Sequence, residues 1–130
     1  MEVAILIPTH KYKFNFYEEK SILQTLSYYN NNFDIFFICP KRLKDKLISF
    51  KIKTISFPNE YFESHKGYNK LCMSKLLYSS FKNYKYVLIN QLDSIILKDN
   101  LIQWCKSNLS YIGGPSYHKK ILSKKPKSPK

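Results

Sequence analysis

The stretch VAILIP, from Val3 to Pro8, decides the predicted fold because it is apolar throughout and shows no polar alternation. A continuous apolar run is typical of a strand that is covered on both faces, as in a parallel sheet with a helix layer on each side. Working outward, similar runs follow in DIFFICP (Asp34–Pro40), in the weaker IKTISFP (Ile52–Pro58) and in YKYVLINQLDSIIL (Tyr84–Leu97). The last run carries a single carboxylate, Asp93, which we expect at the end of the most deeply buried strand.

Helical patterns occupy the segments between these runs. Asn15, with Glu18 three residues later, has the spacing of a capping box and predicts the start of the first helix. KRLKDKLIS (Lys41–Ser49) predicts a short basic helix, and a third helix begins at Gly67. The predicted apolar stripes are Ile22, Leu23 and Leu26 in the first helix and Cys72, Met73, Leu76, Leu77 and Phe81 in the third. The remaining predicted elements are a helix around Leu101–Cys105 and a short fifth strand, SYIGG (Ser110–Gly114).

The alternation of strand and helix indicates an α/β domain with a mainly parallel sheet of about five strands and helices on both faces. If the first three strands extend one way and the fourth returns beside the first, the strand order reverses between strands one and four. Ligands bind such sheets at the carboxyl ends of the strands, at this reversal. The helix that opens at Gly67 begins at the same edge and offers free backbone N–H groups. The crevice residues predicted in this way are Pro8, Thr9, His10, Gln91, Leu92, Asp93, Lys66, Gly67, Tyr68 and Asn69.

The charge is strongly unbalanced, with 22 Lys and Arg against nine Asp and Glu in 130 residues. Six lysines and two prolines lie in the last twelve residues, so we expect one folded domain over residues 1–115 and a basic, disordered tail over residues 116–130. The excess of lysine favours nucleotide or other polyanionic partners. No stretch has the length of a transmembrane helix, and three widely spaced cysteines, each inside an apolar segment, are typical of reduced core thiols in a cytosolic protein.

Asp93 has two interpretations that the pattern leaves open. A carboxylate at the ligand edge of a strand can hold a hard divalent cation, which in turn neutralises a diphosphate. Alternatively, Asp93 caps the next helix or turn. For Thr9 and His10 an ordinary strand-to-loop turn is the favoured interpretation on the pattern alone, and Tyr68 with Asn69 also fits the first turn of a helix.

The segments VAILIPTHK, SILQTL, YNKLCMSKLLYSSFKNYKYVLINQLDSIIL, LIQWC and YIGGP resemble the N-terminal half of the DUF5672 family, a bacterial group similar to GT-A glycosyltransferases. The resemblance covers about residues 3–115. It implies a Rossmann-like GT-A half that binds a nucleotide-sugar donor. Because members of such families continue beyond YIGGP into an acceptor-binding half, it also implies that this chain is truncated.

The resemblance further implies roles for individual residues. Pro8 to Lys11 would hold the nucleoside, and a DxD-type element after the fourth strand would bind a metal ion and the donor phosphates. Asp93 is the one carboxylate of that element, since Gln91 or Ile95 stands where its partner is expected, so Mn²⁺ or Mg²⁺ would have one protein carboxylate. Lysines such as Lys66 or Lys70 could neutralise the diphosphate instead. The implied donor-binding residues are Pro8, Thr9, His10, Lys11, Lys66, Tyr68, Asn69, Gln91, Asp93 and Ser94, with Asp93 also as metal ligand.

The expected function is that of a glycosyltransferase-like protein of bacterial glycan or surface-polysaccharide synthesis. Its partners would be a nucleotide-diphosphate sugar donor and a glycan acceptor. We expect it in the cytoplasm, at the inner face of the membrane, with peripheral contact through the basic tail. One alternative is a catalytically inactive truncated remnant or nucleotide-binding module. Another is a small basic nucleic-acid-binding protein, although the lysines are not interleaved with aromatic residues as in known modules, so no specific nucleic acid is expected.

Overall fold

The fold is that of a computed structural model, which describes residues 2–47, 50–98, 100–107 and 110–111. The chain divides into two compact units, Met1–Asp99 and Asn100–Lys130. In the second unit, helix α4 spans Leu101–Cys105. Of the predicted fifth strand, Ser110 and Tyr111 are not in a strand, and the rest lies outside the described residues, as does the predicted tail. The predicted domain boundary at residue 115 also falls outside them.

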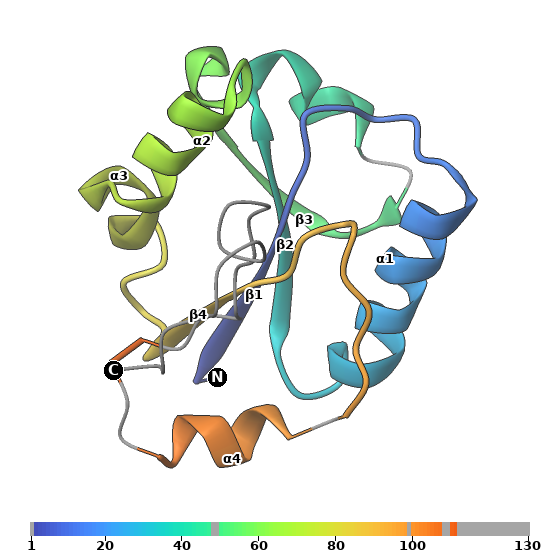
Figure 1. The fold of residues 1–130 in the computed structure, drawn as a ribbon, viewed down its shortest axis with the longest axis vertical. Helices are drawn as coiled ribbons and strands as arrows, with labels where there is room; N and C mark the ends of the chain where they lie inside the picture. The colour runs from blue at the N-terminus through green and yellow to red at the C-terminus, as the bar shows by residue number, and fades with distance from the viewer. Residues whose placement is uncertain (1, 48–49, 99, 108–109, 112–130) are drawn as a thin grey trace, which may run out of the picture. The chain divides into compact units, whose positions relative to one another are not determined.

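The first unit is built on a parallel sheet of four strands (Figure 1). The strands are β1 (Val3–Pro8), β2 (Asp34–Pro40), β3 (Lys53–Phe57) and β4 (Tyr86–Ile89). Their order is β3-β2-β1-β4, so the fourth strand returns beside the first, which is the condition under which the sequence predicts a crevice between them. β1 pairs with β2 on one side and with β4 on the other, both in parallel. The strand order therefore reverses between β1 and β4.

Helices lie on both sides of this sheet. Figure 1 shows α1 on one side and α2 with α3 on the other. The elements between the strands are α1 (Phe16–Tyr29), the 3-10 helices η1 (Lys41–Lys46) and η3 (Asn59–Phe62), α2 (His65–Cys72) and α3 (Lys75–Ser79). The basic helix predicted over residues 41–49 is therefore a 3-10 helix ending at Lys46. Both faces of the central strands are covered, which explains why β1 and β2 are apolar without alternation.

Successive residues of β1 and β2 point to opposite faces and form two aromatic-rich cores. On the side of α2 and α3, Phe36 packs edge-to-face on Phe81, with ring centroids 5.2 Å apart. On the side of α1, Phe37 stacks on Phe14 at 6.1 Å and meets Phe50 edge-on at 5.8 Å. The phenylalanines of β2 therefore anchor both layers to the sheet.

The start of α1 is as predicted, but its buried face differs from the predicted stripe. The Asn15 side chain accepts from the Glu18 N–H and the Glu18 carboxylate accepts from the Asn15 N–H, which confirms the capping box. Ile22 is buried, whereas Leu23 is 63% exposed. The buried positions are Ser21, Ile22, Thr25 and Tyr29. The prediction for Leu23 was wrong because two small polar residues, which hydrogen-bond within the fold, occupy the inward face.

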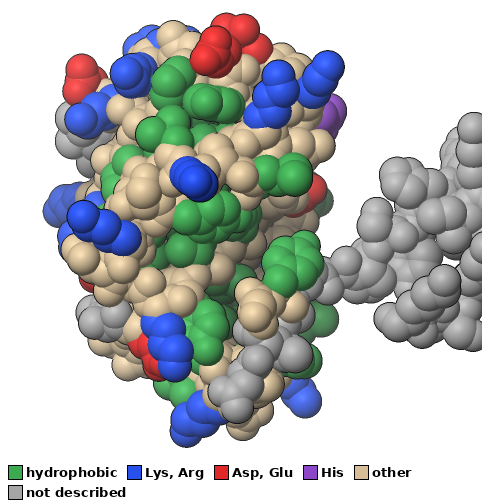
Figure 2. Space-filling model, turned by 90° about the vertical axis from the view of Figure 1, so that its left-hand side faces the viewer, with side chains coloured by type: hydrophobic (Ala, Val, Ile, Leu, Met, Phe, Trp, Pro, Cys, Tyr) green, Lys and Arg blue, Asp and Glu red, His purple; other side chains and the backbone are tan. Residues whose placement is uncertain are grey.

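The single helix predicted from Gly67 is two helices. The chain leaves the helical path at Met73, and the Ser74 hydroxyl accepts from the Leu77 N–H as the cap of α3. The break changes the phase of the apolar stripe, so Leu77 is buried while Met73 is 87% exposed and Leu76 is 44% exposed. Figure 2 looks onto this side of the first unit and shows hydrophobic side chains among lysines.

Strand β4 is shorter and less buried than predicted. It ends at Ile89, four residues before Asp93, and all four of its residues are half-buried. Its last contact with the sheet is the Asn90 N–H, which donates to the Leu6 carbonyl at 2.8 Å. In the described sheet β4 pairs with β1 alone, which explains its exposure. The prediction that Asp93 ends the most deeply buried strand was therefore wrong.

Raising the pH above 10 should weaken the fold through Tyr84, whose hydroxyl donates to the Asp34 carboxylate. Burial, followed by the hydrogen bond to Asp34 and its charge, raises the pKa of Tyr84 to about 12. The folded state thus holds this proton more tightly than the unfolded chain. Its contribution is complete below the ordinary pKa, about 10, and is lost as pH rises through 12.

The measurement is urea unfolding at pH 8, 10 and 11, with variants that separate Tyr84 from other groups that titrate in this range. Tyr84→Phe should show a shallower decline of the unfolding free energy above pH 10 than the native chain. Tyr17→Phe, at a 78% exposed ring, should follow the native chain. Burial also raises the pKa of Cys39 to about 11, so a residual decline is expected in both variants. Parallel curves for Tyr84→Phe and the native chain would contradict the assignment.

No helix in the described part of the chain is both long and apolar enough to cross a membrane. The three cysteines lie within the described residues and form no disulfide. Cys39 is buried in β2, whereas Cys72 is half-buried at the end of α2. The prediction of core thiols is therefore correct for Cys39 and only partly so for Cys72 and Cys105, which are both half-buried.

Candidate ligand-binding crevice

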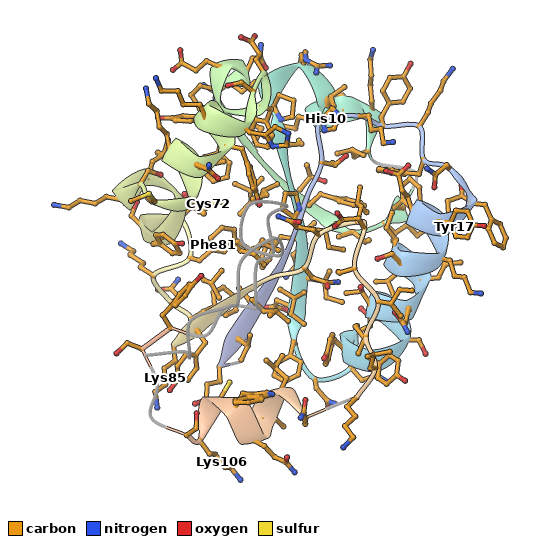
Figure 3. All side chains as sticks on the ribbon, in the orientation of Figure 1. His10, Tyr17, Cys72, Phe81, Lys85 and Lys106 are labelled. Carbon is orange, nitrogen blue, oxygen red and sulfur yellow. The ribbon has the colours of Figure 1, made fainter. Side chains whose placement is uncertain are left out.

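A crevice of about 500 Å³ opens at the carboxyl ends of β1 and β4. This is the size range of pockets that hold small molecules and cofactors. Its lining consists of Pro8, Thr9, His10, Lys11, Glu18, Phe62, Glu63, Ser64, His65, Tyr68, Gln91, Leu92 and Asp93. Figure 3 places His10 at this end of the sheet, where β1 leaves it. The residues come from three places in the sequence that only the strand order brings together.

The β1 side of the crevice is a stabilised turn. The Thr9 N–H donates to the Ile38 carbonyl at 2.9 Å, and its hydroxyl donates to the Lys11 carbonyl at 2.7 Å. The Thr9 side chain also accepts from the Lys11 N–H at 3.2 Å. Arg42, in η1 directly after β2, donates from Nη2 to the His10 carbonyl at 3.1 Å. The Thr9 hydroxyl therefore holds the turn. The His10 side chain is exposed, while the His10 backbone is held by the hydrogen bond from Arg42.

Lys11 and Glu18 form an ion pair at the edge of the crevice, with Nζ and Oε1 2.7 Å apart. Desolvation acts to raise the pKa of Glu18. The hydrogen bond from the Asn15 N–H, the pairing with Lys11 and the nearby His10 outweigh this effect and lower the pKa below its ordinary value. Glu18 thus stays ionised and neutralises Lys11. Sequence reasoning had assigned Glu18 to the capping box alone, and the structure gives its carboxylate both roles.

The β4 side of the crevice is a tight turn from Gln91 to Ser94, closed by the Ser94 N–H donating to the Gln91 carbonyl at 3.0 Å. Asp93 lies in this turn and is exposed. The Ser94 hydroxyl donates to the Asn90 side-chain oxygen at 2.8 Å and to the Gln91 carbonyl. Ser94 therefore shapes the turn that carries Asp93, and it is not among the crevice-lining residues.

A polar network fastens this turn to α1. The Ser21 hydroxyl donates to the Ser94 carbonyl at 2.9 Å, and the Asn90 amide donates to the Thr25 hydroxyl at 2.7 Å. The Gln24 amide group donates to the Ile96 carbonyl and accepts from the Ile96 N–H, each at 2.8 Å. Sequence reasoning missed this network. Its one signal was the pair of polar residues, Ser21 and Thr25, spaced one helical turn apart on a helix that had to bury a face.

The third wall is the first turn of α2. The Ser64 side chain accepts from the Gly67 N–H at 3.0 Å and caps the helix, so His65 and Tyr68 are presented to the crevice. The aligned peptide dipoles make this end of the helix favourable for anions. Lys66 and Asn69 lie on the same helix but are exposed and do not line the crevice.

The hydroxyl of Tyr68 is buried and has no hydrogen-bond partner among the described residues. Burial, and then the neighbouring Cys72 thiol, raise the pKa of this hydroxyl, whereas the Gln91 side chain acts in the opposite direction. At neutral pH the hydroxyl is therefore protonated. Tyr68 lines the crevice together with Gln91 and Asp93 of the β4 turn.

The crevice lining is acidic, although the chain as a whole carries a net charge of +13. Glu18 is neutralised by Lys11, while the carboxylates of Glu63 and Asp93 also line the space. Within the described residues no three His, Cys, Asp or Glu side chains are grouped as a metal site. The residues present thus do not form a metal cage of protein ligands. Of the metal ligand that the sequence predicted, the structure shows that the Asp93 carboxylate is exposed and lines the crevice.

Seven of the ten residues that sequence reasoning assigned to a donor site line the crevice together: Pro8, Thr9, His10, Lys11, Tyr68, Gln91 and Asp93. The other three, Lys66, Asn69 and Ser94, do not. Lining residues that were not predicted are Glu18, Phe62, Glu63, Ser64 and His65. The 3-10 helix η3 brings Phe62 to the crevice, and no element was predicted there.

A protein-family model described as "Protein of unknown function (DUF5672)" matches residues 51–129. The match covers β3, both helices of the α2–α3 pair, β4 and the Gln91–Ser94 turn. It begins later than the resemblance over residues 3–115 suggested and extends past residue 115. No curated protein and no solved structure matches the chain.

Proposed function

The chain belongs to the DUF5672 family, and we propose its function from the crevice. Most of the crevice lining comes from the residues that the family model matches, and the end of β1 supplies much of the rest. The crevice binds a nucleoside-diphosphate sugar, and the chain is a glycosyltransferase-like protein with a GT-A-type nucleotide-binding half. The acceptor is a glycan. This assignment of reaction class draws on analogy at the level of the fold as well as on the site.

The observation that carries the proposal is the position of the crevice. It lies at the carboxyl ends of parallel strands, between β1 and β4, where the strand order reverses. Open α/β sheets bind nucleotides at this position because the strand ends and the following helix present backbone groups to a common space. The capped first turn of α2 borders the same space and favours a phosphate group.

The acidic lining supports a cation-dependent mode of binding. A diphosphate brought near Glu63 and Asp93 is repelled unless a positive charge lies between them. Lys66 and Lys70, which could have supplied that charge, do not line the crevice. Asp93 is exposed on a rigid turn and would hold Mn²⁺ or Mg²⁺, whose charge would neutralise the phosphates. This chain's own residues orient the ligand through the α2 N-terminus and the Thr9 turn.

The test is calorimetric titration of the purified chain with UDP, GDP and CDP, each with and without Mn²⁺. One nucleotide should bind in the presence of Mn²⁺, and Asp93→Ala should weaken that binding by at least about tenfold, which corresponds to about 1.4 kcal/mol. Asp45→Ala removes an exposed carboxylate in η1 that does not line the crevice, so it should bind like the native chain.

Two results would count against the proposal in different ways. No binding of any of the three nucleotides by folded protein would overturn the nucleotide site itself. Equal binding by Asp93→Ala and the native chain, with no effect of Mn²⁺, would leave the site but overturn the role of Asp93. Circular dichroism of both variants shows whether each is folded.

Binding and transfer are separated by a product assay. A transferase hydrolyses or transfers the sugar of its donor, whereas a nucleotide-binding module leaves the donor intact. Chromatography of nucleotide-sugars after incubation with the chain therefore decides between these two crevice-based functions. The nucleic-acid alternative is outside this test, because it depends on lysines of residues 119–130, which lie outside the described residues.

A further inference from the structure

An exposed surface of aromatic and lysine side chains lies on the outer side of α1 and on the loop before it. We call it the aromatic-lysine face, and its members are Tyr12, Lys13, Phe16, Tyr17, Lys20 and Leu23, with Lys46 of η1 beside Tyr12. Phe16 is 71% exposed, Tyr17 is 78% exposed and Leu23 is 63% exposed. Figure 3 shows Tyr17 pointing away from the sheet. Large apolar side chains with this exposure stabilise no core, so the fold does not explain them.

The lysines of this face lie beside the rings. The Lys20 ammonium lies 5.9 Å from the centroid of the Phe16 ring. Lys13 and Lys46 approach the Tyr12 ring at 5.9 and 4.7 Å. The rings of Phe16 and Tyr17 meet edge-on at 5.6 Å. The face therefore combines two groups in which rings lie beside ammonium groups, one around Tyr12 and one around Phe16.

The backbone under the face is held in place. The capping box formed by Asn15 and Glu18 fixes the start of α1, and Ser21 and Thr25 bind the inner side of the helix into the polar network. The Glu18 carboxylate is paired with Lys11 and adds no unpaired negative charge. Glu19 is the one exposed carboxylate within the sequence of the face, whereas Lys13, Lys20 and Lys46 supply three positive charges. The face thus presents a preorganised, net positive surface.

We propose that the aromatic-lysine face docks on the surface of an anionic lipid bilayer. Rings and leucine enter the boundary between headgroups and acyl chains, while the flexible lysine stems let the ammonium groups reach the lipid phosphates. Each lysine near an anionic surface adds to the attraction. A protein partner fits less well, because lysine is depleted from the cores of protein interfaces, whereas rings and lysines together are typical of membrane interfaces.

Docking in this way brings the crevice close to the bilayer. His10 and Lys11 line the crevice, and Tyr12 of the face follows them directly in the chain. The turn between them is held by the Thr9 hydroxyl and by Arg42. A lipid-attached molecule at the headgroup level would therefore lie near the crevice. The membrane proposal itself does not depend on what the crevice binds.

The experiment is flotation of the full chain with vesicles of phosphatidylcholine alone and of phosphatidylcholine mixed with phosphatidylserine. The native chain should bind the mixed vesicles and bind phosphatidylcholine weakly. The triple variant Phe16→Ser, Tyr17→Ser, Leu23→Ser should partition onto mixed vesicles at least about tenfold less. Met73→Ser removes an 87% exposed apolar side chain on the other side of the sheet and should bind like the native chain.

A matched charge pair separates this face from general basicity. Lys13→Glu with Lys20→Glu should reduce binding to the mixed vesicles at least about tenfold more than Lys70→Glu with Lys82→Glu, although both variants change the net charge equally. All four lysines are exposed, so neither variant disturbs the core. Circular dichroism confirms that each variant is folded.

Three outcomes overturn the proposal. The first is equal vesicle binding by the triple variant and the native chain, which would assign any binding to the six lysines of residues 119–130. The second is no binding of the native chain to either kind of vesicle. The third is a native dimer in size-exclusion chromatography that the triple variant converts to a monomer without loss of vesicle binding, which would make the face a contact between two copies.

Discussion

Replacing Phe37 with alanine should lower the free energy of unfolding by about 3–5 kcal/mol, a large part of the stability of a small domain. Phe37 is fully buried in β2. Its ring contacts Phe14 from the loop before α1 and Phe50 from the segment before β3, and those two rings also meet each other at 5.2 Å. Removing the central ring leaves a cavity that its rigid neighbours cannot fill.

The matched control is Phe16→Ala, which deletes the same side chain from a 71% exposed position. Its effect on the free energy of unfolding should stay within about 0.5 kcal/mol. Urea unfolding followed by far-ultraviolet circular dichroism measures both. Similar losses at Phe37 and Phe16 would contradict the burial described for β2. A stable Phe16→Ala chain would also agree with a role of that ring outside the fold.

Replacing Gly67 with alanine should destabilise the chain by about 1–3 kcal/mol, although the same change in most helices is stabilising by up to about 1 kcal/mol. A Cβ atom at Gly67 would lie 2.6 Å from the backbone carbonyl oxygen of Glu60 and 3.3 Å from the Ser64 hydroxyl. The first contact is with the backbone of η3, which cannot rotate away. The helix must therefore move, and its first turn forms a wall of the crevice.

Asn69→Ala is the control for this prediction because Asn69 lies on the same helix and is exposed. It should be neutral or slightly stabilising, since alanine has the higher helix propensity. Thermal unfolding compares the two variants, and nucleotide titration shows whether the displaced helix also weakens binding in Gly67→Ala. A gain in stability at Gly67 would mean that α2 and η3 lie further apart than the structure has them.

The first three strands were predictable because the signal for each lies within its own residues, whereas β4 is shorter than the run that predicted it. VAILIP and DIFFICP coincide with β1 and β2, and the third strand differs by one residue at each end. The start of α1 was equally local, since a capping box joins residues three positions apart. The break at Ser74 also had a local signal, since serine is a common N-cap residue. The prediction missed this signal because the apolar residues on both sides of Ser74 fit the stripe of one continuous helix.

The candidate site was predictable in its position and less so in its chemistry. Because β1 and β4 are parallel neighbours, Pro8 and Gln91 lie at the same edge of the sheet regardless of their side chains. The position of the crevice therefore follows from the strand order. The partners of the side chains did not follow. Pairing of Lys11 with Glu18 and fastening of the Ser94 turn by Ser21 depend on how α1 packs on the sheet, which no short pattern records.

The sequence by itself determined the alternation of strands and helices, the parallel sheet and the edge of the sheet at which the crevice opens, because each depends on local patterns and on the handedness of short connections. The tertiary structure alone decided which faces are buried. It left Leu23 and Met73 in solvent, buried Thr25 and placed Glu63 in the crevice. The physical reason is that burial and pairing are properties of two surfaces in contact, and a sequence pattern describes only one of them.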